Sequence, residues 1–257
     1  MLELKNIHKY YNPGTVNEMC LFQDFSLTIQ KGEFVSVVGS NGSGKTSMLN
    51  IICGSIPIEA GQILIDGKEI TREKEFKRNR KIGRVYQNPA MGTCPSMTIL
   101  ENMSLADNKG KLYGLSRGTN KARIDFYREN LAQLGLGLED KLHVKVGSLS
   151  GGQRQAMALL MSTMTPIEFL ILDEHTAALD PKTADLIMEL TDKIVKEKHL
   201  TTIMVTHNLR YAVDYGNRLI MMHQGECVMD KTGEEKQKIS TDEILKVFNK
   251  IIIECGN

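Results

Sequence analysis

Hydrophobic and polar positions change between two periods along this chain, and the change predicts alternating strands and helices. Apolar and polar residues alternate in "LELKNI" near the N-terminus and in "FQDFSLTI" from Phe22 to Ile29, as in half-buried strands. "FVSVVG", "FLILD" and "TTIMVT" are short and mostly apolar, which favours strands buried on both faces. Helical spacing places Leu186, Ile187, Leu190 and Ile194 on one face of a helix.

The order of these elements predicts a fold class. Helical segments after "FVSVVG" and "FLILD" separate the buried strands, and such alternation predicts a largely parallel sheet with right-handed crossovers. Hairpins are expected at Asp66-Gly67 and at Gln224-Gly225. The stretch from about Asn88 to Gly147 is polar and mostly of helical character. Ligands of open α/β sheets bind at the carboxyl ends of the strands, so the polar residues there are the candidates for a site.

Composition limits the classes of protein. The 257 residues carry a formal net charge of +1, which does not indicate a nucleic-acid-binding protein. Five scattered cysteines form no CxxC pair, which argues against zinc and a disulfide framework and favours a reducing cytosol. The N-terminus lacks the apolar core of a signal peptide, and no apolar run approaches the ~20 residues of a membrane helix. We expect a soluble protein.

A phosphate-binding loop is the first specific motif. "GSNGSGKTS" fits G-x-x-x-x-G-K-[ST] and stands between an expected strand and an expected helix. Its glycines allow main-chain N–H groups to point at phosphate oxygens, and the helix N-terminus adds partial positive charge. Lys45 is expected to neutralise phosphate charge, and the Thr46 hydroxyl to bind Mg²⁺. The whole loop is expected to contact nucleotide: Gly39, Ser40, Asn41, Gly42, Ser43, Gly44, Lys45, Thr46 and Ser47.

Four further motifs follow in a fixed order. "LSGGQ" begins at Leu149, "ILDE" ends an apolar strand, "ALD" follows it, and His207 comes after another strand. With the phosphate loop, this order resembles the nucleotide-binding subunit of an ABC transporter over nearly the whole chain. The resemblance implies a P-loop NTPase (RecA-like) α/β core with an N-terminal antiparallel β subdomain and an α-helical subdomain. It implies one domain, residues 1–257, with the core at about 1–88 and 165–257 and the helical subdomain at about 89–164.

The resemblance also implies roles for particular residues. Asp173 would help to hold Mg²⁺, Glu174 would act on the attacking water, and Gln87 would touch Mg²⁺ or that water. His207 would contact the γ-phosphate. Tyr11 would stack on adenine, with the neighbouring Tyr10 as the alternative.

The second helix start, after Leu149, is expected to act on a second copy of the chain. Taken alone, Ser150 reads as a helix N-cap. In the family, two copies pair head to tail, and the signature of one copy completes the ATP site of the other. Residues expected there are Ser150, Gly151, Gly152 and Gln153. Asp180 is expected both to cap the helix that begins at Pro181 and to approach the dimer interface.

The implied function is ATP hydrolysis that powers a separate membrane permease. The cofactors are ATP and Mg²⁺. An importer of a small solute is favoured, with an extracytoplasmic substrate-binding protein as an indirect partner and a cytoplasmic location on the inner face of the membrane. The alternative is a soluble ABC ATPase that acts as an assembly scaffold.

His175 departs from the proline that is usual in the family. The segment "DEHTAALDP" resembles a bacterial importer subgroup for which amino acids, aromatic ones included, are among the suggested cargoes. Consecutive strand-end side chains diverge, so Asp173, Glu174 and His175 are not expected to form one metal cluster.

Overall fold

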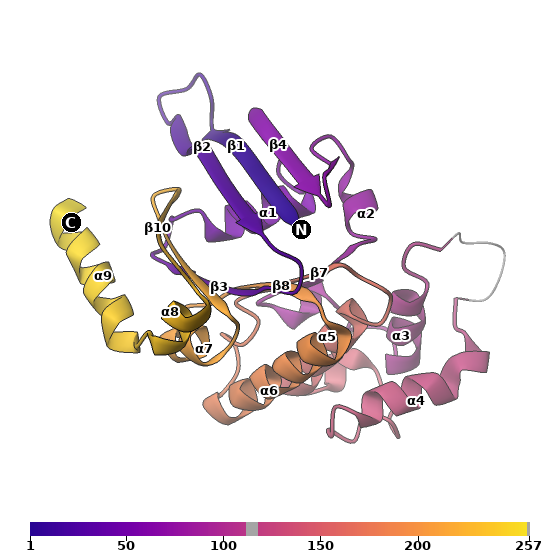
Figure 1. The fold of residues 1–257 in the computed structure, drawn as a ribbon. Helices are drawn as coiled ribbons and strands as arrows, with labels where there is room; N and C mark the ends of the chain where they lie inside the picture. The colour runs from indigo at the N-terminus through magenta and orange to yellow at the C-terminus, as the bar shows by residue number, and fades with distance from the viewer. Residues whose placement is uncertain (112–117, 256–257) are drawn as a thin grey trace. The chain divides into compact units, whose positions relative to one another are not determined.

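The first strands of the chain form an antiparallel sheet. The computed structural model describes residues 1–111 and 118–255. Strand β1 (Leu2–Tyr11) lies between β2 (Met19–Ile29) and β4 (Ala60–Ile65), and β5 (Lys68–Glu69) pairs with β4 (Figure 1). Asp66 and Gly67 both have positive φ between β4 and β5, as a tight hairpin turn requires. This hairpin confirms the one expected at Asp66-Gly67.

This sheet belongs to the first of two compact units, which comprises Met1–Asn79 and His199–Asn257. In the same unit, β3 (Phe34–Gly39) runs parallel to both β8 (Thr201–Val205) and β9 (Arg218–His223). β10 (Glu226–Thr232) returns antiparallel to β9. All six residues of β3 are buried, which explains its nearly continuous apolar run.

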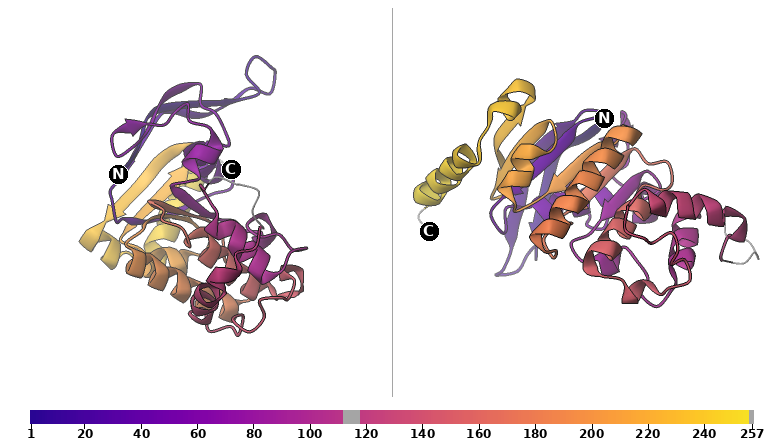
Figure 2. Two further views of the ribbon diagram at one scale, coloured as in Figure 1. Left: turned by 90° about the vertical axis from the view of Figure 1, so that its right-hand side faces the viewer. Right: turned by 90° about the horizontal axis from the view of Figure 1, so that it is seen from below.

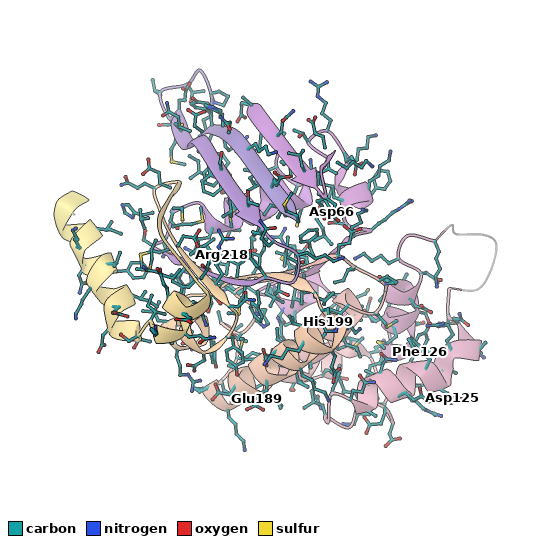
Figure 3. All side chains as sticks on the ribbon, viewed as in Figure 1. Asp66, Asp125, Phe126, Glu189, His199 and Arg218 are labelled. Atoms are coloured by element: carbon teal, nitrogen blue, oxygen red, sulfur yellow. The ribbon has the colours of Figure 1, made fainter. Side chains whose placement is uncertain are left out.

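Helices of four to fifteen residues complete the first unit. They are α1 (Lys45–Cys53), α2 (Glu75–Arg78), α7 (Leu209–Asp214), α8 (Gly233–Lys238) and α9 (Thr241–Cys255). Arg218, labelled in Figure 3, ties β9 to β10 by hydrogen bonds of 2.9 and 2.7 Å to the Asp230 carboxylate. Its guanidinium also donates to the main-chain oxygen of Thr28 in β2 at 2.7 Å. One arginine therefore links strands from both sheets of this unit.

The second unit comprises Arg80–Lys198. Its strands β6 (Ile82–Val85) and β7 (Phe169–Asp173) are parallel neighbours. Its α-helices are α3 (Ile99–Asp107), α4 (Ile124–Ala132), α5 (Gly151–Ser162) and α6 (Pro181–Lys198), with 3₁₀ turns at Pro89–Met91, Lys121–Arg123 and Val146–Ser148. The long helix α6 is drawn in orange in Figure 2.

The fold class is confirmed, and the buried face of α6 is corrected. Antiparallel strands at the N-terminus, mostly parallel strands elsewhere and a helix-rich middle are typical of a P-loop NTPase. Leu186 was expected on the apolar face but is 37% exposed, whereas Met188 and Thr191 are fully buried. The buried face of α6 is therefore rotated slightly from the predicted one. Helical spacing alone does not distinguish the centre of a buried face from its edge. The predicted boundaries of core and helical subdomain stay a prediction.

Candidate nucleotide-binding site

The phosphate loop joins the buried strand β3 to helix α1, and its glycines are fixed by close neighbours. A Cβ atom at Gly39 would lie 2.2 Å from the carbonyl oxygen of Met222. A Cβ atom at Gly44 would lie 2.9 Å from the ring of Phe22, and Gly44 itself has a φ of 100°. Both positions therefore require glycine for a steric reason.

Lys45 lies over this loop. Its Nζ donates to the main-chain oxygens of Gly39 and Ser40, both at 2.8 Å, and to Ser43 Oγ at 3.3 Å. The side chain is buried, while Asn41, Gly42 and Thr46 are exposed. A lysine held on loop carbonyls at the positive end of a helix is suited to polyphosphate.

Tyr11, and not Tyr10, contacts the helix that follows the loop. The hydroxyl groups of Tyr11 and Ser47 are 3.0 Å apart. Lys9 Nζ lies 5.5 Å from the centroid of the Tyr11 ring. Tyr10 pairs across the sheet with Cys20 instead. Of the two tyrosines left open by the sequence, Tyr11 is therefore the one beside α1.

A histidine that the sequence did not single out also touches the loop. His223 ends β9, and its Nδ1 lies 3.4 Å from Ser40 Oγ. The next turn is attached as well, since the N–H of Gly225 donates to the main-chain oxygen of Ser43 at 3.1 Å. A Cβ atom at Gly225 would lie 1.7 Å from the carbonyl oxygen of Leu21. The β9–β10 hairpin thus supports the phosphate loop from one side.

His207 follows the carboxyl end of β8, which pairs with β3 up to Val37 and Val205. The strand ends at Val205, so His207 lies two residues beyond it and is exposed. Next to it, the Asn208 side chain caps α7 by accepting from the N–H groups of Arg210 and Tyr211. Within the first unit, His207 thus follows the sheet end at which the phosphate loop begins.

In the second unit, Asp173 ends β7 and pairs with an arginine of the neighbouring strand. Arg84 Nη2 lies 2.9 Å from Asp173 Oδ2, and the two side chains are 11% and 12% exposed. The Arg84 guanidinium also lies 4.6 Å from the centroid of the Tyr86 ring. Arg84 was not among the site residues predicted from the sequence. A charged residue inside the apolar strand "IGRVY" was the available signal, because buried arginines are normally paired.

Glu174 sits at a sharp turn directly after Asp173. Its φ is +49°, a conformation that non-glycine residues rarely adopt. The turn is closed by a hydrogen bond of 2.9 Å from the N–H of Ala177 to the oxygen of Glu174. Glu174 is partly exposed, while His175 and Thr176 are buried. Burial lowers the pKa of His175 to about 4.

Gln87 follows Tyr86 and is exposed. The main chain just before it is fixed, because Gln155 Nε2 donates to the oxygen of Tyr86 at 3.0 Å. Just after it, Asn88 caps the 3₁₀ turn Pro89–Met91 by accepting from the N–H of Ala90. An exposed glutamine between two fixed points is free to meet a ligand.

The signature segment begins helix α5 with a capping box. Ser150 Oγ accepts from the N–H of Gln153, and Gln153 Oε1 accepts from the N–H of Ser150, both at 3.2 Å. Ser150 and Gly151 are exposed. Gly152 is buried, and a Cβ atom there would lie 2.2 Å from Thr183 Cγ2 in α6. Gly152 and Gln153 therefore have structural tasks that their motif did not reveal.

Asp180 caps α6, as the sequence predicted. Its Oδ1 accepts a hydrogen bond of 3.1 Å from the N–H of Thr183. Helix α6 begins at Pro181, so Thr183 is its third residue. Hydrogen bonds from the side chain and main chain of Thr183 lower the pKa of Asp180. The residue is exposed.

The donors present fit Mg²⁺ that arrives with a nucleotide. Among residues 1–111 and 118–255, no three His, Cys, Asp or Glu side chains gather as a metal site. The first unit offers the exposed Thr46 hydroxyl beside the phosphate loop, and the second unit offers the Asp173 carboxylate and the exposed Gln87 amide. Mg²⁺ commonly takes one or two protein ligands together with substrate phosphates and water. ATP therefore fits the phosphate loop, and each of these oxygen donors is of a kind that Mg²⁺ accepts.

Comparison with known proteins decides the family. Residues 22–177 match the family model described as ABC transporter. The tyrosine transport ATP-binding protein of Clostridioides difficile (strain R20291) is 48% identical over 248 residues, which cover 96% of this chain and 98% of that protein. The chain belongs to the ABC transporter family. It is an ABC ATPase.

Further relatives of this ABC ATPase also match over nearly their whole length. The glutamine transport ATP-binding protein GlnQ of Geobacillus stearothermophilus is 29% identical over 96% of this chain and 97% of that one. The solved dimer of the ATP-binding cassette MJ0796, in a post-hydrolysis state bound to ADP and Pi, matches with a TM-score of 0.76 and 32% identity. That match covers 90% of this chain and 98% of that one. In the described part of the ABC ATPase, no helix combines the length and the apolar character needed to cross a bilayer.

Proposed function

We propose that this ABC ATPase pairs head to tail with a second copy of itself and powers a separate membrane permease. The observation that carries the proposal is the phosphate loop. Lys45 rests on the carbonyls of Gly39 and Ser40 at the start of α1, between glycines that no other residue can replace. An intact loop of this kind supports nucleotide turnover and not merely a structural role.

The residues near the strand ends divide the chemical work. Lys45 binds β- and γ-phosphate oxygens, and His207 contacts the γ-phosphate as a hydrogen-bond donor. Glu174 accepts a proton from the attacking water or polarises it. Gln87 orients that water. Bound Mg²⁺ supplies neutralisation of phosphate charge, and the residues that would hold it are Thr46, Asp173 and Gln87. Tyr11 stacks on the adenine.

The signature segment acts on the partner copy. In the single chain, Ser150 and Gly151 are exposed at the N-terminus of α5, a twelve-residue helix whose positive end suits the γ-phosphate of a nucleotide bound to the other copy. Asp180, also exposed, lies at the start of α6 and approaches the same dimer interface. The dimeric cassette bound to ADP and Pi supports this arrangement.

Import of amino acids is the favoured task. Two relatives are named as tyrosine and glutamine transport ATP-binding proteins. The tyrosine transport ATP-binding protein is 48% identical to this chain. Together with the "DEHTAALDP" segment, this supports an importer subgroup that takes aromatic amino acids. The other expected partners are permease subunits and, indirectly, an extracytoplasmic substrate-binding protein. The ATPase then lies on the cytoplasmic face of the membrane.

Dimer formation tests the proposal. Glu174→Gln keeps the shape of the side chain and removes the carboxylate, so it should bind ATP without hydrolysing it and elute as a dimer in gel filtration. The matched control is Lys45→Ala in the same background, which should stay monomeric with ATP. A Glu174→Gln chain that binds ATP and remains monomeric would contradict the head-to-tail pairing. Co-expression with a membrane permease encoded beside it should carry the ATPase into the membrane fraction; a chain that stays soluble would favour the scaffold alternative.

A further inference from the structure

His175 is a buried histidine placed between the two carboxylates of the site and helix α6. Its side chain is 2% exposed, and its Nε2 lies 3.2 Å from Thr191 Oγ1 in the third turn of that helix. Thr191 is fully buried. The buried polar groups of His175 and Thr191 thus satisfy each other's hydrogen-bonding requirement without water.

The direction of this hydrogen bond follows from the second contact of Thr191. The Thr191 hydroxyl donates to the main-chain oxygen of Ile187 at 2.7 Å. A hydroxyl has one proton, so the Thr191 oxygen must accept from His175. Nε2 of His175 therefore carries a proton, and its hydrogen bond anchors the main chain of His175 to the middle of α6.

The anchored main chain is the turn that carries Glu174. One end of the turn is fixed by β7, and the other end by Asp180, which caps α6. Between these points, Glu174 adopts a φ of +49°. A non-glycine residue in this region is strained and persists only when its surroundings hold it there. His175 is the next residue, and its bond to Thr191 attaches the turn to α6, in addition to the Ala177–Glu174 hydrogen bond within the turn.

We propose that His175 is a positioning residue for Glu174, which it serves by anchoring the turn to Thr191. The inference rests on the proposed role of Glu174 in hydrolysis. Without the anchor, Glu174 can relax to a negative φ. The orientation of its carboxylate then changes. Nucleotide binding at the phosphate loop uses other residues, so the anchor affects the chemical step and not ATP affinity.

Paired substitutions at Thr191 test this idea without changing the residue next to Glu174. Thr191→Val keeps the shape of the side chain and removes the acceptor, whereas Thr191→Ser keeps the hydroxyl. Steady-state ATPase activity of the full chain gives kcat and KM, a fluorescent ATP analogue gives the Kd, and thermal unfolding gives the Tm. We expect Thr191→Val to lower kcat about tenfold, because small misplacements of a reacting group have effects of this size or more. We expect an unchanged Kd, and near-parental kcat for Thr191→Ser.

Several results would overturn the inference. A Thr191→Val chain with a lower Tm but the parental kcat, assayed well below its Tm, would show a purely structural contact. Equal losses in Thr191→Val and Thr191→Ser would show that the hydroxyl is irrelevant. In the His175→Leu background the anchor is already gone, so an additional tenfold loss from Thr191→Val would also contradict it.

The Glu174→Gln variant separates this inference from the proposed function. If Glu174→Gln hydrolyses ATP at the parental rate, the role of Glu174 is wrong and the positioning role falls with it. If Glu174→Gln is inactive while Thr191→Val is normal, the proposed function stands and only the anchor is wrong.

Discussion

Acid should destabilise this protein through His175 more than through an ordinary histidine. The folded pKa is about 4, against a usual value of 6.5, because the imidazole is fully buried. Between these values the unfolded chain binds a proton that the folded chain does not. His175 therefore does not reduce the free energy of unfolding above pH 6.5. As the pH falls from 6.5 towards 4, protonation of the unfolded chain lowers that free energy.

The size of the effect follows from the difference in pKa. Each unit of pKa is worth about 1.4 kcal/mol, so the shift from 6.5 to about 4 amounts to roughly 3 kcal/mol at the acid end. That is a large share of the ~5–15 kcal/mol that stabilises a typical domain. It is also an effect of one residue, so a single substitution can isolate it.

Urea unfolding at several pH values between 7.5 and 4.5 measures this contribution. The chain has no tryptophan, so far-UV circular dichroism is the appropriate signal. Nucleotide-free protein in EDTA excludes any effect of ATP or a metal ion. His175→Gln retains an N–H donor but does not titrate, and the other histidines are common to both chains. The parent should lose roughly 2–3 kcal/mol more than His175→Gln over this range; parallel pH dependences would refute the neutral, buried imidazole.

Three further substitutions have expected outcomes. Lys45→Ala should abolish binding of a fluorescent ATP analogue with an unchanged circular dichroism spectrum; retained affinity would contradict the phosphate-loop assignment. Arg84→Met removes the partner of the nearly buried Asp173 and should cost about 3 kcal/mol in urea unfolding, most of which Asp173→Asn should restore in the double variant. Gly152→Ala forces a methyl group against Thr183 and should cost about 1–3 kcal/mol. Adding Thr183→Ser should recover this loss, and a failure to recover it would contradict the steric explanation.

The elements that the sequence predicts well are those with a strong periodic or turn signal. β3, β7 and β8 are apolar runs of five or six residues, and burial on both faces leaves few other structures for such runs. The Asp66-Gly67 and Gln224-Gly225 turns are equally clear, because few residue pairs tolerate positive φ. The capping role of Asp180 also follows from local chemistry, since the residue precedes a proline that begins a helix.

The contacts that the sequence does not predict join residues far apart in the chain. Arg84 and Asp173 are 89 positions apart, and their pairing depends on β6 lying beside β7 in one particular register. His175 and Thr191 meet because α6 returns over the turn from which it starts. Leu186 was placed on the wrong side of α6 for the same reason: the neighbour that covers a helix face is decided by tertiary packing and not by spacing within the helix.

The N-termini of α1 and α5 differ in a way that orders their use in the proposed function. Gly44, at the start of α1, provides no side-chain cap, so ligand oxygens meet the N–H groups of this helix without competition from an N-cap side chain. At the start of α5, Ser150 and Gln153 already cap each other, and a phosphate group must add to or displace these bonds. In the proposed function, ATP therefore binds first to the phosphate loop of one copy. The capped helix of the partner joins afterwards, because its N–H groups meet the phosphate only when the second copy arrives.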